Sequence, residues 1–236
     1  MQLSRTTAAL AWSALAAGLS MGFSLIAEAG LHAYLPDAPW RPLLSNFGYS
    51  VGFLIVILAR QQLFTEITLT PVLAMLERRT SASVMGVARV WSTVLAGNLL
   101  GALAFALMIV HTSVISSELQ AAVREISHPA IEPEFGVVFL RGIFGGWLMA
   151  LLVWLLPAAK SARVWIIIMM TWVIGLGHFS HVISGSLEVF ALAAANELDW
   201  ARALVGFTLP ALVGNIVGGV TLVAFLNHAQ VASDRD

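Results

Sequence analysis

Two histidines and a glutamate interrupt an apolar stretch in the C-terminal half of the chain. The segment GLGHFSHVISGSLEV contains His178, His181 and Glu188 between the apolar runs VWIIIMMTWVI and FALAAA. Histidine has an unperturbed pKa of about 6.5, so its ring exchanges a proton near neutral pH. An anion that enters an apolar passage loses its hydration at a high cost in free energy. A histidine between apolar walls is therefore suited to protonate a weak-acid anion, or to hold it by a hydrogen bond.

Further ionisable side chains lie in the apolar segments, where a charge costs about 2.5–3.5 kcal/mol at mid-depth and must pair or face water. Arg141 has three acidic candidates as partner, and we predict that it pairs with Glu188 or Glu66. The alternative is that Arg60 or Arg141 attracts anions in a vestibule. A Glu66 that faced the pore would instead favour cations. The third acidic candidate for Arg141 is Glu28.

The composition is that of an integral membrane protein. Of the 236 residues, 59% are hydrophobic and 11% are charged, whereas soluble domains have about 25% charged residues. The net charge of -1 offers no basic surface for a nucleic acid. There are no cysteines, which excludes disulfides and cysteine-based zinc sites.

The apolar residues form six segments, and a spanning helix needs about 20 such residues. Two of the segments are too long for one simple span and are interrupted by polar residues, at 59–66 and at 175–189. Each of these two is interpreted as a pair of half-helices around a break. The sequence thus predicts an all-α protein of six transmembrane helices, two of them broken, with the segments at roughly 7–31, 43–76, 90–112, 136–159, 164–195 and 203–227.

The distribution of positive charges predicts the orientation in the membrane. Connecting segments on the cytoplasmic side carry an excess of Lys and Arg. Seven such residues fall on one side and three on the other, which places both termini in the cytoplasm and the loop 116–134 outside. A cleaved signal peptide is the rival interpretation of the first segment. The seven are Arg5, Arg78, Arg79, Arg89, Lys160, Arg163 and Arg235, and the three are Arg41, Arg124 and Arg202.

An internal repeat links the two broken segments. AGNLLGALAF, beginning at residue 96, matches VGNIVGGVTL, beginning at residue 213, at an offset of 117 residues. We interpret residues 1–236 as a single transmembrane domain made of two inverted repeats, roughly 7–112 and 136–227. At the same offset, Phe64 in the first break corresponds to His181 in the second. In inverted repeats, paired broken helices meet near the bilayer midplane and form the permeation site. Asn98 and Asn215 are expected to tie helices to neighbouring backbone, and the glycines beside them to serve helix packing.

Five motifs lie along the chain: QLFTEITL (62–69), GNLLGAL (97–103), GWLMALLVWL (146–155), GHFSHV (177–182) and LPALVGNIVGG (209–219). Together they resemble the formate/nitrite transporter family. The resemblance covers nearly the whole chain and implies a homopentamer of aquaporin-like protomers, each with its own pore. It implies transport of small monovalent anions such as formate, nitrite, lactate or hydrosulfide across the inner or plasma membrane, with no cofactor.

The resemblance also implies pore residues. The leucine-phenylalanine-threonine loop of the family falls on Leu63, Phe64 and Thr65, and its pore histidine falls on His181 when FSH is matched to it. Thr65 is then a hydroxyl donor opposite His181. Leu63, Phe64 and Phe179 are the expected apolar walls. Whether His178 or His181 is the pore histidine stays open.

The chain departs from the family pattern at three places around the pore. Ser180 replaces the acidic residue before the histidine, Gly185 the asparagine four residues after it, and Gly146 the asparagine before Trp147. With the added charged residues, the pattern resembles the divergent YfdC-like branch. The transported species and its charge sign stay open.

Other functions are less consistent with the sequence. A cation channel of the same fold, selective through pore-facing glutamates, is the alternative. An intramembrane metalloenzyme would use His178, His181 and Glu188, but the HExxH zinc signature is absent. A water or glycerol channel would carry the sequence NPA, which the chain lacks. A structural scaffold would not need matched breaks in both halves. We therefore expect a channel or transporter and not an enzyme, with no metal.

Overall fold

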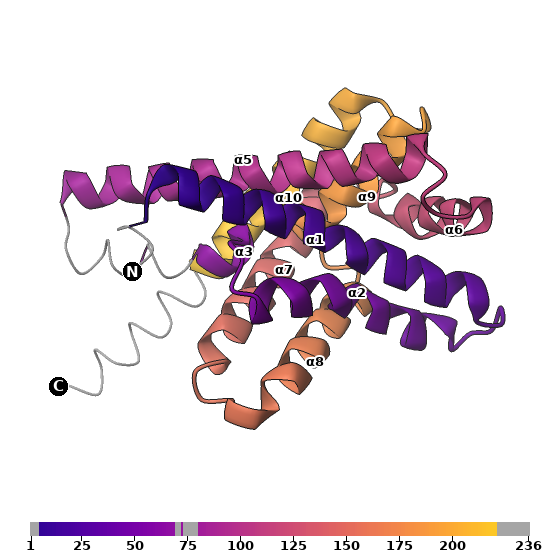
Figure 1. The fold of residues 1–236 in the computed structure, drawn as a ribbon, viewed down its shortest axis with the longest axis horizontal. Coiled ribbons are helices and arrows are strands. Elements are labelled where there is room, and N and C mark those ends of the chain that lie inside the picture. The colour runs from indigo at the N-terminus through magenta and orange to yellow at the C-terminus, as the bar shows by residue number, and fades with distance from the viewer. Residues whose placement is uncertain (1–4, 69–71, 73–79, 221–236) are drawn as a thin grey trace.

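The computed structural model describes residues 5–68, 72 and 80–220, and within these ranges all regular structure is helical (Figure 1). The elements in chain order are α1 (Thr7–Tyr34), α2 (Arg41–Leu58), α3 (Phe64–Ile67), α5 (Ser81–His111), α6 (Ser117–Ser127), η2 (His128–Ala130), α7 (Phe135–Leu155), η3 (Lys160–Ala162), α8 (Arg163–Leu176), α9 (Val182–Ala194), the π-helical η4 (Arg202–Thr208) and α10 (Leu209–Ile216).

The long helices follow the apolar segments of the sequence. In the described ranges, five are long and apolar enough to span a bilayer: α1, α2, α5, α7 and the run of η4 with α10. The sixth span is divided between α8 and α9, as expected for a broken helix. Side-chain caps fix two of the starts, because the Thr6 hydroxyl accepts from the N–H of Ala9 at 3.3 Å and Thr80 forms a capping box with Ser83. The predicted all-α, six-span fold is confirmed.

The helices are arranged as two related halves. In the first half α1 packs along α5 and against α2, and in the second α7 packs along the equivalent α10 and against α8. Figure 1 shows α1 and α5 side by side along the long axis, with α7 and α8 on the other side of the molecule. The broken spans, α2 with α3 and α8 with α9, therefore occupy equivalent places in the two halves.

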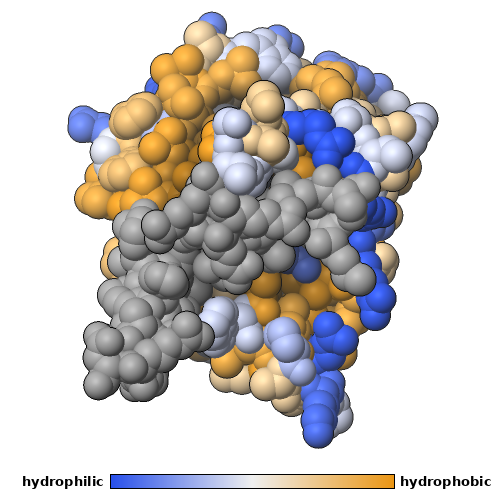
Figure 2. All heavy atoms as spheres, turned by 90° about the vertical axis from the view of Figure 1, so that its left-hand side faces the viewer, coloured by the Kyte–Doolittle hydropathy of each residue, from blue (hydrophilic) through white to orange (hydrophobic). Residues whose placement is uncertain are grey.

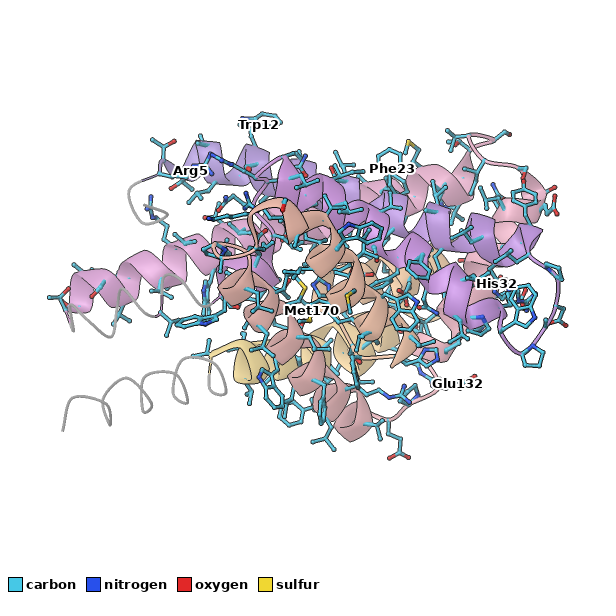
Figure 3. All side chains as sticks on the ribbon, turned by 90° about the horizontal axis from the view of Figure 1, so that it is seen from below. Arg5, Trp12, Phe23, His32, Glu132 and Met170 are labelled. Carbon is cyan, nitrogen blue, oxygen red and sulfur yellow. The ribbon has the colours of Figure 1, made fainter. Side chains whose placement is uncertain are left out.

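Apolar side chains cover the flanks of this helix bundle. Trp12 is 73% exposed and Phe23 50% exposed, and both point outward from α1 (Figure 3). Figure 2 shows the end of the molecule near the N-terminus, where hydrophobic residues gather along one flank and hydrophilic residues along the opposite edge. Such exposed apolar faces suit contact with lipid or with other copies of the chain.

Glycines bring the paired helices of each half into close contact. A Cβ at Gly101 of α5 would lie 2.6 Å from the carbonyl oxygen of Leu15 on α1. In the second half, a Cβ at Gly218 would overlap the carbonyl oxygen of Ile143 on α7. Small residues at such positions let helix backbones approach. The interpretation of these glycines as packing residues is confirmed.

A bulky residue at Gly101 is expected to destabilise the fold. Leucine there must displace the α1 backbone, and overpacking of this kind typically costs about 1–3 kcal/mol or more. The matched control is Ala104→Leu, because Ala104 lies on the exposed face of the same helix. We expect a lower thermal unfolding temperature in detergent for Gly101→Leu than for Ala104→Leu. Equal temperatures for the two variants would contradict the packing role.

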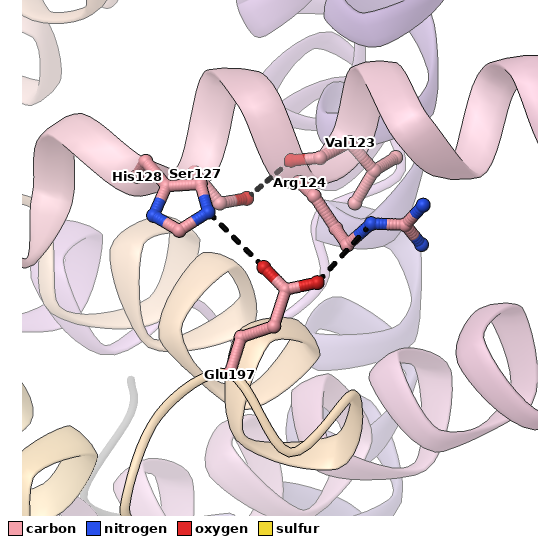
Figure 4. A network of polar contacts seen from close by, with 5 residues as sticks. All are labelled: Val123, Arg124, Ser127, His128 and Glu197. Atoms are coloured by element: carbon pink, nitrogen blue, oxygen red, sulfur yellow. Dashed lines mark hydrogen bonds and ion pairs between the residues drawn. The ribbon is translucent and has the colours of Figure 1, made fainter.

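The segment 116–134, interpreted from the sequence as a loop, contains a helix. The Ser116 hydroxyl accepts from the N–H of Leu119 at 3.2 Å and begins α6, which packs on α1 and α9. Figure 4 shows how the segment is attached to the turn after α9. One oxygen of Glu197 lies 3.2 Å from Arg124 Nε, and the other lies 3.1 Å from His128 Nε2. These contacts hold α6 over one end of the bundle.

Candidate functional site

Both broken spans end their first half-helix in the same way. Arg60 after α2 and His178 after α8 adopt left-handed backbone conformations, with φ of 56° and 50°. Each donates its N–H to the carbonyl three residues earlier, at 3.2 and 2.9 Å, and the next residue donates to the carbonyl five residues earlier, at 2.9 and 3.0 Å. This is the Schellman pattern of helix termination. The predicted breaks at 59–66 and 175–189 are therefore real turns of matching geometry.

A buried asparagine stabilises the break in each half. Asn98 Oδ1 accepts from the N–H of Phe64 at 2.8 Å, and its Nδ2 donates to the carbonyls of Ala14 at 2.7 Å and Gln62 at 2.8 Å. Unpaired backbone groups are costly in a membrane interior. Asn98 is fully buried. Its amide therefore supplies the hydrogen bonds that water cannot supply to the backbone at this depth.

Asn215 does the same in the second half. Its Oδ1 accepts from the N–H of Val182, and its Nδ2 donates to the carbonyls of Gly142 and Ser180, all at 2.8 Å. The expected role of both asparagines as ties between helices and backbone is confirmed.

These bonds correct the predicted correspondence between the two breaks. The asparagines equate Phe64 with Val182, so the equivalent of His181 is Leu63 and not Phe64. The physical reason is a difference of one residue in chain length. Phe64 and Asn98 are 34 residues apart, but Val182 and Asn215 are 33 apart. The offset that relates the two asparagine motifs is therefore one residue too small to relate the two breaks.

His181 connects the two breaks. It is the N-cap residue of α9 and is 1% exposed. Its Nδ1 accepts from the N–H of Ser184 at 3.2 Å, and its Nε2 lies 2.7 Å from Oγ1 of Thr65 on α3. Thr65 is 2% exposed. Of the two histidines, His181 is the one that contacts Thr65, as expected from the sequence.

The hydrogen bonds of His181 determine its tautomer. A backbone N–H can only donate, so Nδ1 must carry a lone pair. In the neutral ring the proton is then on Nε2 and is donated to Thr65 Oγ1. The hydroxyl hydrogen of Thr65 is left without an acceptor in the described part of the chain. This arrangement offers one hydrogen-bond donor to a passing solute.

Apolar side chains surround this pair. Leu63 and Phe64 are buried, and the ring of Phe64 meets Trp91 edge-on with centroids 5.8 Å apart. Phe179 stacks on Phe144, with the ring centroids 5.3 Å apart. The ring of Phe53 meets the His181 ring edge-on at 5.0 Å.

A cavity of about 320 Å³ leads to His181 from the end of the molecule where α6 lies. We call it the α6-side cavity. His32, which lines it, lies at the opposite end of the long axis from Arg5 in Figure 3. The sequence-predicted residues that line it are His178, Phe179, His181, Arg141 and Glu188. They come from α7, the second break and α9.

The predicted ion pair of Arg141 is wrong. Among the described residues, Arg141 makes no ion pair with Glu188 or Glu66. Arg141 and Glu188 line the same open space, whereas Glu66 lies on α3 and does not line it. Arg60 is exposed and also lies outside the α6-side cavity. One carboxylate oxygen of Glu66 is buried without a hydrogen-bond partner in the described structure.

Sequence reasoning gave too little weight to Glu28. The sequence pattern points to it only as a partner for Arg141, yet it lines the α6-side cavity beside Tyr49, Asn46 and Glu188. The signal that could have found it is its position in an apolar span, where a carboxylate is rare and usually functional. His178, His181 and Glu188 share this cavity but, in the described structure, do not form a group able to hold a metal ion.

Comparison with known proteins identifies relatives over almost the whole length. The family model described as formate/nitrite transporter matches residues 1–229. The chain is 41% identical over 233 residues to the inner membrane protein YfdC of Escherichia coli K12, covering 99% of this chain and 75% of that protein. It is 26% identical over 220 residues to the formate channel BtFdhC of Bacillus thuringiensis, covering 89% of this chain and 82% of that protein.

Solved structures share the fold. A pentameric formate channel with formate bound superposes with a TM-score of 0.80 at 20% identity, over 96% of this chain and 98% of that chain. An ion channel of the same family superposes with a TM-score of 0.79 at 19% identity, over 94% of this chain and 90% of that chain.

Proposed function

The chain belongs to the formate/nitrite transporter family of channels and transporters, and from this premise we propose that it passes small monovalent anions, or their neutral weak acids, through a pore in each protomer. Formate and nitrite represent the substrate class. Relatives named as formate channels support this choice.

The bond between His181 and Thr65 is the observation that carries the proposal. It lies where the two broken helices meet, among buried apolar side chains. An ion is costly there because it loses its hydration. The Thr65 hydroxyl, oriented by His181, donates a hydrogen bond to the oxygen of the solute and offsets part of that cost.

While the His181 side chain caps the N-terminus of α9, it acts as a hydrogen-bond partner and not as a proton donor. Giving up the Nε2 proton would leave an imidazolate, which is not accessible near neutral pH. Net donation needs a cationic ring with a proton on Nδ1, and that proton would face the N–H of Ser184. A donor role for His181 therefore requires release of the α9 cap. The geometry supports the hydrogen-bonding role.

The proposed setting is a homopentamer in the inner or plasma membrane with both termini in the cytoplasm. Exposed apolar side chains such as Leu100 at 60% and Leu140 at 56% supply faces for lipid and neighbouring protomers. The pentameric structure with the same fold supports the assembly. Orientation rests on the excess of Lys and Arg on the side of the termini. The α6-side cavity then opens to the outside.

Flux measurements on proteoliposomes test the function. We expect the purified protein to conduct formate and nitrite well above protein-free vesicles, and potassium no faster than they do. If the anion crosses in charged form, the current under a gradient of the permeant salt should reverse at a potential whose sign indicates anions. If it crosses as the neutral acid, uptake should occur without a current. Absence of flux for every small anion tested would refute the proposal.

A cation channel of the same fold is the second candidate. Glu28 and Glu188 line the α6-side cavity, and one oxygen of Glu66 is buried without a partner in the described structure. The anion proposal predicts no potassium current in either the parent or Glu66→Gln. A potassium current in the parent that falls in Glu66→Gln would favour the cation channel instead.

A further inference from the structure

The α6-side cavity contains two carboxylates without partners. Glu28 on α1 and Glu188 on α9 both line it, and they are close enough to interact electrostatically. Neither side chain makes a hydrogen bond or an ion pair with any residue in the described ranges. Two ionised carboxylates in one such space repel each other, and a proton held by the pair removes that repulsion.

The other charged groups around the cavity do not neutralise this pair. Oε1 of Glu125 lies 3.0 Å from Nε2 of His32 and 3.8 Å from a guanidinium nitrogen of Arg41. Arg141 acts electrostatically on His178, which is exposed at the break. Among the residues that the structure describes, the titratable groups that line the cavity are Glu28 and His32 from α1, Tyr49 from α2, Glu125 from α6, Arg141 from α7, His178 and His181 from the second break, and Glu188 from α9.

Two serines on the wall of the cavity offer hydroxyl groups to a polar solute. Ser45 is 3% exposed and Ser180 is 7% exposed, and both line the cavity. Their hydroxyl groups have no hydrogen-bond partner in the part of the chain that the structure describes. Buried polar groups are normally paired. A solute with oxygen atoms would supply the missing partners.

We propose that Glu28 and Glu188 form a proton-loading site, which holds an exchangeable proton and gives it to the substrate anion in the α6-side cavity. This rests on the proposed transport of weak-acid anions. Arg141 attracts the anion, the carboxylate pair neutralises it, and the neutral acid moves on to Thr65 and His181. His181 keeps the cap of α9 throughout, so it does not have to supply the proton.

The transfer balances without any further reactant. The O–H bond of one glutamic acid breaks, and an O–H bond forms on an oxygen of the formate or nitrite anion. The glutamate left behind takes a proton from water at the open end of the cavity. Beyond Thr65 the acid releases its proton to water on the other side. One anion and one proton therefore cross together.

Infrared spectroscopy tests the site without relying on transport. The parent protein at neutral pH should show a carboxylic acid carbonyl band that shifts in heavy water and is lost in Glu28→Gln and in Glu188→Gln. Glu118→Gln is the matched control, because Glu118 is exposed on α6 and does not line the cavity. Absence of the band in the parent, or an unchanged band intensity in both cavity variants, would overturn the proposal.

Flux measurements test the role of the site in transport. Positioned proton transfer contributes about 10²-fold or more, so formate uptake at neutral pH should fall by about 10²-fold in the two cavity variants and stay unchanged in Glu118→Gln. Uptake equal to or above that of the parent would refute the loading role, since the carboxylates would then only repel anions. If the parent conducts no anion at all, the proposed function fails, and the infrared result still decides whether the proton site exists. Thermal unfolding of each variant verifies that it is folded.

Discussion

Replacing Asn215 by leucine is expected to cause the largest loss of stability of any single buried polar substitution in the second half. The change removes the partner of the Val182 N–H and of the carbonyls of Gly142 and Ser180. Each buried group left without a partner costs about 1–3 kcal/mol. The sum is a large part of the roughly 5–15 kcal/mol that stabilises a folded protein. We therefore expect little folded Asn215→Leu in the membrane.

Two comparisons separate this effect from a general intolerance of substitution. Asn98→Leu should be equally severe, because Asn98 makes the corresponding three bonds in the first half. Ser92→Ala on the helix that carries Asn98 should be mild, since among the described residues the Ser92 hydroxyl bonds only the carbonyl of Arg89. The measurements are the yield of detergent-soluble protein and its thermal unfolding temperature. Wild-type stability of Asn215→Leu would show that the break does not depend on this side chain.

Loss of His181 is expected to cause the largest loss of transport at the junction of the two breaks. His181→Ala removes both the Nε2 bond to Thr65 and the Nδ1 cap on Ser184. Loss of an N-cap costs about 0.5–2 kcal/mol of stability. Because Thr65 is no longer oriented toward the solute, we expect formate flux to fall by about 10²-fold, the effect of a lost positioned donor.

A second variant separates the cap from the contact with Thr65. Asparagine is a good N-cap residue, so His181→Asn should retain the bond from the Ser184 N–H while its shorter side chain loses Thr65. We expect His181→Asn to be as stable as the parent and to pass formate as slowly as His181→Ala does. Thr65→Val should reduce flux similarly, and the double variant should add little, because the two side chains act as one unit. Unchanged fluxes in His181→Ala and Thr65→Val would refute a role of this pair in permeation.

Sequence reasoning located the breaks because their causes are local. A left-handed residue ends a helix through bonds to carbonyls three and five residues back, and polar residues inside an apolar run reveal such an interruption. The likeness of the segments around Asn98 and Asn215 identified the repeat, and the burial of both amides follows from their place in apolar helices. The sequence pattern singles out both His181 and Thr65, and the structure adds the contact between them.

The sequence by itself thus determined that the chain spans a membrane with six apolar segments, that two of these are broken, and that a histidine lies in one break. These properties depend on hydropathy and on neighbours within a few residues. Only the tertiary structure decided that Leu63 and not Phe64 corresponds to His181, that Arg141 forms no ion pair with Glu188, and that Glu28 and Glu188 line one cavity. Such contacts depend on the rotation and depth of helices that are distant in the chain, and a shift of one residue along a helix turns a side chain by about 100° around the helix axis.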